Sequence, residues 1–257
     1  MKSKKILLIC LVLVIVAVFG SNILAAEKKV LVVGMDPHGV PWAYIDENGN
    51  PTGFTVEAIN WIAQEMDFEV IHQPISWDVI ISTLLAKKLD FIGSGMTITE
   101  ERAKVVDFTI PYMTIDQAVC VREDSDLNMI EVLSGKYLAG TQRGCTAAFW
   151  IEDNLIKKGV FNKDNLRLFE GFDLAVESLL NGRIDSAMMD DVMLAASIKD
   201  KPLKIIGTLI TGEVYGYAVR KEDKELLATL NEGLTRLMKS PTWGELKAKY
   251  IPKSISK

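Results

Sequence analysis

The hydrophobic pattern of the chain alternates between short apolar runs and longer segments with one apolar face. Val30-Leu31-Val32-Val33 is a continuous apolar run, which is typical of a buried strand. From Phe54 to Met66 the apolar residues instead recur three and four positions apart, as in a helix with one buried face. Further strands are predicted at 68–75, 90–95, 137–141, 166–169, 184–189 and 203–206, and further helices at 77–85, 146–158, 174–180, 192–198, 224–238 and 242–250. This alternation predicts βαβ units and a largely parallel sheet.

One arrangement of helix end and strand occurs twice along the chain. A predicted helix ends at Lys87-Lys88-Leu89-Asp90 before a buried strand, and a later one ends at Asn181-Gly182-Arg183-Ile184-Asp185 before another. The repetition predicts two similar α/β lobes. We assign residues 27–119 and 215–257 to the first lobe and 120–214 to the second, so that the chain crosses between them twice. Two crossings form a hinge, and a hinge between α/β lobes leaves a cleft for a ligand.

The first 26 residues have the pattern of a secretory signal peptide. Lysines at positions 2, 4 and 5 precede fourteen apolar residues, Ile6 to Phe19, and the small pair Ala25-Ala26 follows. The apolar run is short for a membrane span, which needs about 20 residues. We therefore expect cleavage after Ala26 and a mature chain that starts at Glu27. An uncleaved membrane anchor is the alternative.

Charge and cysteine content exclude several classes of function. The whole chain has a net charge of -5, and removal of the three N-terminal lysines leaves -8. An acidic surface argues against nucleic acid and anionic membranes as partners. Only Cys120 and Cys145 remain in the mature chain, which is too few for a disulfide framework. No Ser-His-Asp set, zinc spacing or phosphate loop occurs in a convincing context, so we expect no metal and no cofactor.

A candidate anion site lies between the strand at 90–95 and a short helix. Thr99 suits the N-cap of that helix, and acidic residues suit its first turn. Arg102 does not fit this position, because a cation near a helix N-terminus is disfavoured. A ligand carboxylate would account for it, with Gly95 allowing close approach and Thr97 adding a hydroxyl. The alternative is a surface salt bridge from Arg102 to Glu101 or Asp107.

Several motifs, in matching order over nearly the whole mature chain, resemble those of the extracellular solute-binding proteins that supply polar amino acids to ABC transporters (family 3). They are Pro41-Trp42, Gly53-Phe54, the segment from Gly95 to Arg102, Phe108-Thr109-Ile110-Pro111-Tyr112 and Asn181-Gly182-Arg183-Ile184-Asp185. The resemblance implies a type II periplasmic-binding-protein fold, in which two α/β lobes joined by a two-strand hinge close on a ligand. It also implies a monomer in the periplasm, a free L-amino acid as ligand, and a membrane ABC permease as partner.

An amino acid ligand needs a cation, an anion and a pocket for its side chain. The resemblance places the α-carboxylate on Arg102, Thr97 and the Gly95 backbone. Asp190, at the end of a predicted strand, is the candidate for the α-ammonium, with Asp191 as the cap of the next helix. The reverse assignment, with Asp190 as the cap, stays open.

The resemblance also suggests walls for the pocket. Trp77 stands where the family often has an aromatic residue over the ligand, whereas Trp42 is better explained as a core residue. Cys145 and Thr146 follow a glycine between a strand and a helix, where backbone N–H groups can bind an anion. The family usually has a hydroxyl where Cys145 stands, so polar recognition there is weakened.

Asp36, His38 and Gly39 lie where the pocket would hold the side chain of the ligand. Asp36 occupies a position that contacts the distal end of the ligand in the family, and Gly39 replaces a usual aromatic. His38 is either a surface residue or a ligand contact. If Asp36 has no partner in a closing cleft, it favours a ligand side chain with N–H groups, such as glutamine, histidine, lysine or arginine.

An enzyme on the same fold is the alternative function. Dehydratases of small carboxylates share this architecture, and their chemistry needs a general acid in the cleft. Asp36, Asp190 and His38 are the candidates. We favour a binding protein, because the two aspartates are better explained as partners of a charged ligand.

Overall fold

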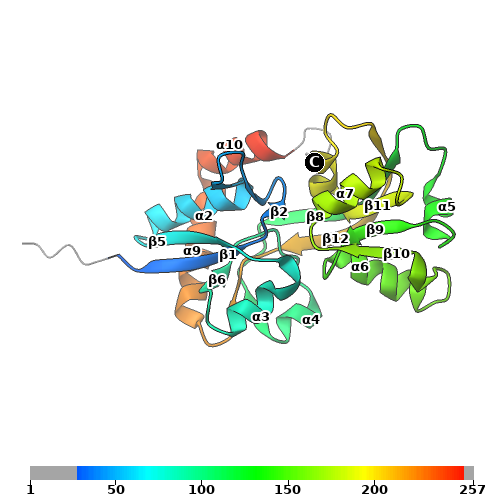
Figure 1. Cartoon of the computed structure of the whole chain (residues 1–257). Coiled ribbons are helices and arrows are strands. Elements are labelled where there is room, and N and C mark those ends of the chain that lie inside the picture. The colour runs from blue at the N-terminus through cyan, green and yellow to red at the C-terminus, as the bar shows by residue number, and fades with distance from the viewer. Residues whose placement is uncertain (1–27, 252–257) are drawn as a thin grey trace, which may run out of the picture.

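The computed structural model describes residues 28–251 and shows two α/β lobes side by side (Figure 1). The predicted signal peptide and its cleavage site lie outside the described residues. Within residues 28–251, no helix is long and apolar enough to cross a membrane.

The first lobe is built on a five-stranded sheet in the order β5-β1-β6-β13-β7. β1 pairs in parallel with β5 and β6, and β13 runs antiparallel to β6 and β7. The strands are β1 (Val30–Met35), β5 (Glu69–Pro74), β6 (Phe91–Ile92), β7 (Val106–Phe108) and β13 (Ala218–Arg220). The helices are α2 (Phe54–Glu65), α3 (Ile80–Leu85), α4 (Glu100–Ala103), α9 (Lys224–Lys239) and α10 (Pro241–Tyr250). A small sheet of β2 (His38–Gly39), β3 (Ala43–Ile45) and β4 (Pro51–Thr52) adjoins it, with a polar turn at 46–50 between β3 and β4.

The second lobe repeats this arrangement, with the strand order β10-β9-β11-β8-β12. Here too three parallel strands are followed by a strand, β8, that is antiparallel to both of its neighbours. The strands are β8 (Met113–Arg122), β9 (Ala139–Gln142), β10 (Leu166–Phe169), β11 (Ser186–Asp190) and β12 (Leu203–Tyr215). The helices are α5 (Met129–Leu133), α6 (Thr146–Ile151), α7 (Phe172–Leu180) and α8 (Asp191–Ser197), with short helical turns at Glu152–Ile156 and Lys163–Asn165. The repeated sequence arrangement thus corresponds to a repeated order of strands.

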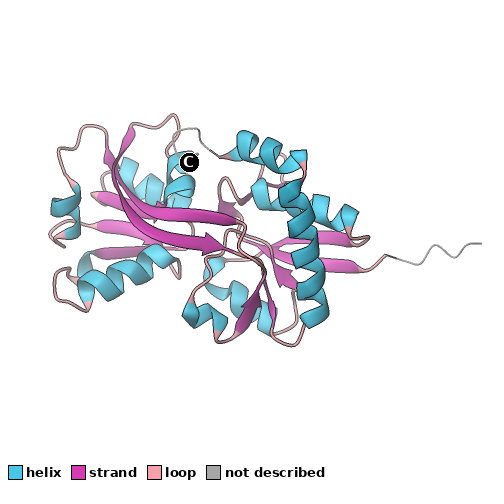
Figure 2. Cartoon of the chain, turned by 180° about the vertical axis from the view of Figure 1, so that it is seen from behind, coloured by secondary structure: helices cyan, strands magenta, loops and turns pink. Residues whose placement is uncertain are grey.

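β8 and β12 are the two long strands that connect the lobes. They pair antiparallel along most of their length, and Figure 2 shows them side by side from the middle of one lobe into the junction. A further bridge joins Thr97 of the first lobe to Tyr215 at the end of β12. The predicted lobe boundaries at 119/120 and 214/215 fall within these two strands and stay a prediction.

Three local predictions differ from the structure. The segment 77–85 begins with a 3₁₀ turn, Trp77–Val79, before α3. That turn changes the phase of the helix, so that Ile80 and Leu84 are buried whereas Val79 and Leu85 are exposed. The helix predicted at 146–158 becomes π-helical after Ile151, and the strand predicted at 203–206 continues to Tyr215.

Candidate functional site

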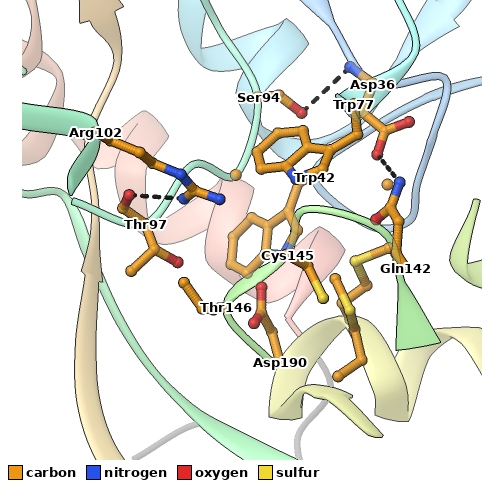
Figure 3. Close-up of a pocket in the computed structure, with 14 residues that line it drawn as sticks. Asp36, Trp42, Trp77, Ser94, Thr97, Arg102, Gln142, Cys145, Thr146 and Asp190 are labelled. Carbon is orange, nitrogen blue, oxygen red and sulfur yellow. Dashed lines mark hydrogen bonds between the residues drawn. The ribbon is translucent and has the colours of Figure 1, made fainter. Parts of the chain in front are cut away.

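One pocket between the lobes contains all eight residues that the sequence predicted for the site. It is lined by residues of both lobes (Figure 3). The predicted residues on its wall are Asp36, Trp77, Gly95, Thr97, Arg102, Cys145, Thr146 and Asp190. The structure adds Gly39, Trp42, Ser94, Gln142, Met189 and Met193. Contact of these residues with a ligand stays a prediction.

Arg102 is a buried cation at one end of the pocket. Its side chain donates from Nη1 to the carbonyl of Thr97 at 2.8 Å and from Nη2 to the carbonyl of Gly144 at 3.0 Å. The guanidinium also lies over the ring of Trp77, at 5.3 Å from the centroid. Burial lowers the pKa of Arg102, whereas the nearby Cys145 and Asp190 raise it. Only 7% of the residue is exposed, so its charge is available to a ligand inside the pocket rather than to solvent.

The predicted alternative for Arg102, a surface salt bridge, is wrong. Glu101 pairs with Lys104 instead, and Asp107 pairs with Lys224. No carboxylate of residues 28–251 forms a salt bridge with Arg102. Thr99 is the N-cap of α4 as expected, since its side chain accepts from the Arg102 N–H. A buried guanidinium bonded only to carbonyls suits an incoming anion.

Asp190 is a buried carboxylate at the end of β11. It accepts hydrogen bonds from Gln117 Nε2 at 2.7 Å and from the hydroxyl of Tyr215. The pKa of Asp190 is raised to about 7, mainly by burial and in part by the Glu213 carboxylate, while the hydrogen bonds from Tyr215 and Gln117 oppose the shift. An ammonium group in the pocket would stabilise the ionised form of Asp190.

The prediction of Asp191 as the cap of α8 is wrong in position, because Asp191 is the first residue of the helix and Asp190 holds the N-cap position. The Asp190 side chain makes no capping hydrogen bond. Asp191 Oδ1 accepts from the N–H of Val192 at 2.8 Å, within the helix. The Asp190 carboxylate is therefore left to face the pocket.

Asp36 has a partner, contrary to the expectation of an unpaired carboxylate. Gln142 Nε2 donates to Asp36 Oδ2 at 2.8 Å, and the His38 N–H donates to Oδ1 at 3.1 Å. Burial raises the pKa of Asp36, and these two hydrogen bonds lower it. The need for a cationic ligand side chain is therefore weaker than the sequence suggested. Gln142 was missed, although its place at the end of β9 is one where ligands bind in α/β sheets.

Cys145 and Thr146 lie where the second lobe meets the pocket. Cys145 is a free thiol, 3% exposed, with its Sγ 3.2 Å from Thr141 Oγ1. Burial raises the pKa of the Cys145 thiol to about 11. Thr146 accepts from Gln117 Nε2 at 3.2 Å. Gly144, just before them, has a φ of 77°, which favours glycine and presents its carbonyl to Arg102.

Glu213 is a polar residue that the sequence analysis missed. It lies in β12 and accepts from the Thr97 hydroxyl and from Gln117 Nε2, both at 3.2 Å. Gln117 in turn bonds Asp190, so one network joins the first lobe, the hinge strands and the second lobe. No local pattern distinguishes Glu213 from other polar residues of a strand.

Three more hydrogen bonds join the lobes at the edge of the pocket. Trp77 Nε1 donates to the Gly144 carbonyl at 3.1 Å, and Ser76 Oγ donates to Glu170 Oε1 at 2.6 Å. His38 Nδ1 lies 3.1 Å from Asp173 Oδ2. His38 is thus a contact between lobes and is absent from the pocket wall. These contacts hold the lobes in a closed arrangement.

Comparison with known proteins identifies the architecture. The model of the bacterial extracellular solute-binding proteins, family 3, matches residues 31–253. A probable histidine-binding protein of Neisseria gonorrhoeae is 31% identical, over 89% of this chain and 85% of its own length. An ancestral arginine-binding protein solved with arginine is 33% identical, with a TM-score of 0.80 and coverage of 88% and 99%. A structure of an ancestral arginine-binding protein with glutamine is also similar, at 32% identity and a TM-score of 0.78, with coverage of 87% and 98%.

A further similar structure bears on enzymatic activity. It is an ancestral amino acid-binding protein described as a precursor of cyclohexadienyl dehydratase, with 31% identity, a TM-score of 0.78 and coverage of 87% and 96%. Together with the two lobes and the two-strand hinge, these likenesses confirm the predicted type II periplasmic-binding-protein fold.

Proposed function

Because the chain belongs to the bacterial extracellular solute-binding proteins of family 3, we propose that it captures a free L-amino acid between its lobes and delivers it to the permease of an ABC importer. The observation that carries this proposal is the pairing of two buried charges in one pocket. Arg102 and Asp190 are 7% and 4% exposed, and both line the space between the lobes. A zwitterion supplies an anion for the first and a cation for the second, which reduces the cost of burying each.

The remaining groups of the pocket support the same ligand class. Thr97 and the Gly95 backbone adjoin Arg102 on the side where the α-carboxylate would bind. Trp77 lies against the Arg102 guanidinium and bonds the opposite lobe, so it would cover the ligand as the lobes close. Cys145 and Thr146 would complete the wall from the second lobe, and Asp36 would face the distal end of the ligand.

The cellular setting follows from the N-terminal sequence and the family. The signal-peptide pattern of residues 1–26 supports export, and a histidine-binding relative from Escherichia coli is named a periplasmic protein. We infer a monomer that acts in the periplasm and whose other partner is a membrane permease.

A dehydratase is the second candidate, favoured by the pKa of Asp190. A carboxyl group that titrates near 7 suits a general acid. In this pocket, however, Asp190 accepts hydrogen bonds from Gln117 and Tyr215, which stabilise the carboxylate form. We therefore propose that Asp190 binds an ammonium group and that the protein catalyses no reaction.

A thermal-shift screen of the ligand-free protein against the twenty L-amino acids tests the proposal. A ligand at 100 times its Kd stabilises the native state by about 2.7 kcal/mol, which gives a clear rise in Tm. We expect one amino acid or a few to raise Tm, and to be recovered unchanged after incubation. A screen in which no amino acid raises Tm contradicts the binding proposal, and conversion of a bound compound contradicts the exclusion of catalysis.

A further inference from the structure

Gln142 joins the two lobes at one end of the pocket. It is the last residue of β9 in the second lobe, and its Nε2 donates to Asp36 Oδ2 of the first lobe at 2.8 Å. The same nitrogen donates to the Glu170 carbonyl at 3.1 Å. Figure 3 shows Asp36 and Gln142 on one side of the two labelled tryptophans and Arg102 on the other. Gln142 therefore lies at the end of the pocket away from the proposed α-carboxylate site.

The two hydrogen bonds fix the orientation of the Gln142 amide. A side-chain amide carries two N–H donors on its nitrogen and only lone pairs on its oxygen. Both neighbours of Nε2 are acceptors, the Asp36 carboxylate and the Glu170 carbonyl. The reversed amide would place its oxygen against these two oxygens and would lose both hydrogen bonds. The Gln142 carbonyl is therefore turned away from Asp36 and from the Glu170 carbonyl.

The carbonyl oxygen of Gln142 is an acceptor that the protein leaves open to a ligand. Within residues 28–251, Oε1 accepts no hydrogen bond, because both bonds of the amide use Nε2. Oε1 of Gln117 is also without a partner but is closed to water, whereas Oε1 of Gln142 is not closed. Gln142 is only 1% exposed and lines the pocket, so this opening lies on the pocket side. A ligand can reach Oε1 without displacing a hydrogen bond of the protein.

Asp36 places an anionic acceptor beside this carbonyl. Its carboxylate accepts from the His38 N–H and from Gln142 Nε2, and these neutral donors leave its charge in place. Within residues 28–251 no ion pair joins Asp36 to a cation, and the His38 ring pairs with Asp173 instead. Since Oε1 and Nε2 of Gln142 share one carbon atom, Oε1 and the carboxylate can both accept from one terminal group of a ligand. Ser94 adds a hydroxyl, which can donate or accept.

The terminal groups of polar side chains differ in how well they suit two adjacent acceptors. Guanidinium and ammonium groups carry several N–H donors and no acceptor, and their charge compensates that of Asp36. An amide has two N–H donors, but it is neutral and brings a carbonyl that needs a donor of its own. A carboxylate has no donor and repels Asp36. The pair of acceptors therefore favours a cationic side chain.

We propose that Gln142 is a specificity-determining residue, whose side-chain carbonyl accepts a hydrogen bond from the cationic group of a bound arginine or lysine while its NH₂ group stays bonded to Asp36. This inference rests on the proposed function, because it takes Arg102 and Asp190 to hold the α-carboxylate and the α-ammonium. It narrows the ligand class from side chains with N–H groups to cationic ones.

Calorimetry of the wild type with two matched pairs of ligands tests the ligand class. Citrulline is arginine with one NH₂ of the guanidinium replaced by oxygen, and norleucine is lysine without its ammonium. We expect arginine or lysine to bind at least tenfold more tightly than its neutral counterpart and than glutamine, as for a hydrogen bond to a charged group. Binding of citrulline or glutamine as tight as that of the better cation would overturn the inference and leave the binding proposal standing. A wild type that binds no amino acid would overturn both.

Two variants separate the carbonyl of Gln142 from its contact between the lobes. Gln142→Met and Gln142→Glu both remove the NH₂ group that bonds Asp36 and the Glu170 carbonyl. Only the Glu variant keeps acceptor oxygens at this position. We expect the preference for the cation over its neutral counterpart to fall about fivefold or more in Gln142→Met, and to be kept or increased in Gln142→Glu.

Ser76→Ala is the matched control. It removes another hydrogen bond between the lobes, to Glu170, from a residue that is absent from the pocket wall. It should change the affinities for the cation and for its neutral counterpart by the same factor, within twofold. A preference that falls equally in Gln142→Met and Gln142→Glu, or that stays at the wild-type value in Gln142→Met, would overturn the role of the Gln142 carbonyl. If Gln142→Met does not fold, a loss of the preference in Gln142→Glu overturns it.

Discussion

Replacement of Arg102 by Ala should remove most of the affinity for an amino acid. Each hydrogen bond from a guanidinium to a ligand carboxylate contributes about 1.5–3 kcal/mol. In the structure Arg102 already donates to the carbonyls of Thr97 and Gly144, so not all of its N–H groups are available to a ligand. We therefore expect a net loss of about 3 kcal/mol, or roughly a hundredfold rise in Kd.

The same variant should also lose some stability in the absence of ligand. Two carbonyls lose their donor and the guanidinium leaves the ring of Trp77, which together should lower the free energy of unfolding by about 1–3 kcal/mol. Calorimetry gives Kd, and urea unfolding without ligand separates the two effects. Arg143→Ala is the control, since it removes the same charge from an exposed position one residue before Gly144. An Arg102→Ala protein that folds and binds within threefold of the wild type would refute the assignment of the carboxylate site.

Other predictions concern the charge, the closure and the packing of the pocket. Asp190 must ionise to bind an ammonium, and its pKa is about 7. Affinity for the amino acid should therefore fall up to tenfold per pH unit below pH 7 and level off above it. Calorimetry that finds constant affinity from pH 5 to 8 contradicts this prediction. The folded-state pKa of Asp190 lies above its usual value of 3.8, so ionisation of Asp190 should lower the free energy of unfolding of the ligand-free protein as pH rises from about 4 to 7. Urea unfolding of Asp190→Asn should lack this part of the pH dependence. Ser76→Ala, which removes the bond to Glu170 across the lobes, should speed ligand dissociation about twofold to fivefold in stopped-flow measurements, and an unchanged rate argues against a role in closure. Gly95→Ala should destabilise the fold by about 1–3 kcal/mol, because its Cβ would lie 2.9 Å from the Tyr215 ring; unaltered urea unfolding contradicts the packing argument.

Local patterns in the sequence were sufficient for most of the fold. The apolar run at 30–33 became β1, and the 3.6-residue period from Phe54 became α2, with Ile59 and Ile62 fully buried. These elements depend on burial of one face, which the pattern records directly. The exposure of Val79 was not predictable in this way, because a single 3₁₀ turn shifts the phase of the side chains that follow.

The eight candidate residues came together because they lie near the ends of strands or in the loops that follow them. Their partners were harder to predict. Gln142 bonds Asp36 across 106 positions in the chain, and Gln117 bonds Glu213 across 96. Contacts between residues so far apart in the sequence depend on how the two lobes close on each other, and no short motif encodes that geometry. The expectation of an unpaired Asp36 failed for this reason.

The most direct test of the account is whether the pocket requires both charges of an amino acid. Calorimetry should compare the best amino acid ligand with its decarboxylated amine and with the acid that lacks the α-ammonium. We predict one binding site per chain for the amino acid and at least a hundredfold weaker binding for each analogue, because Arg102 or Asp190 is then left buried without its partner. Binding of either analogue within threefold of the amino acid would contradict the central claim.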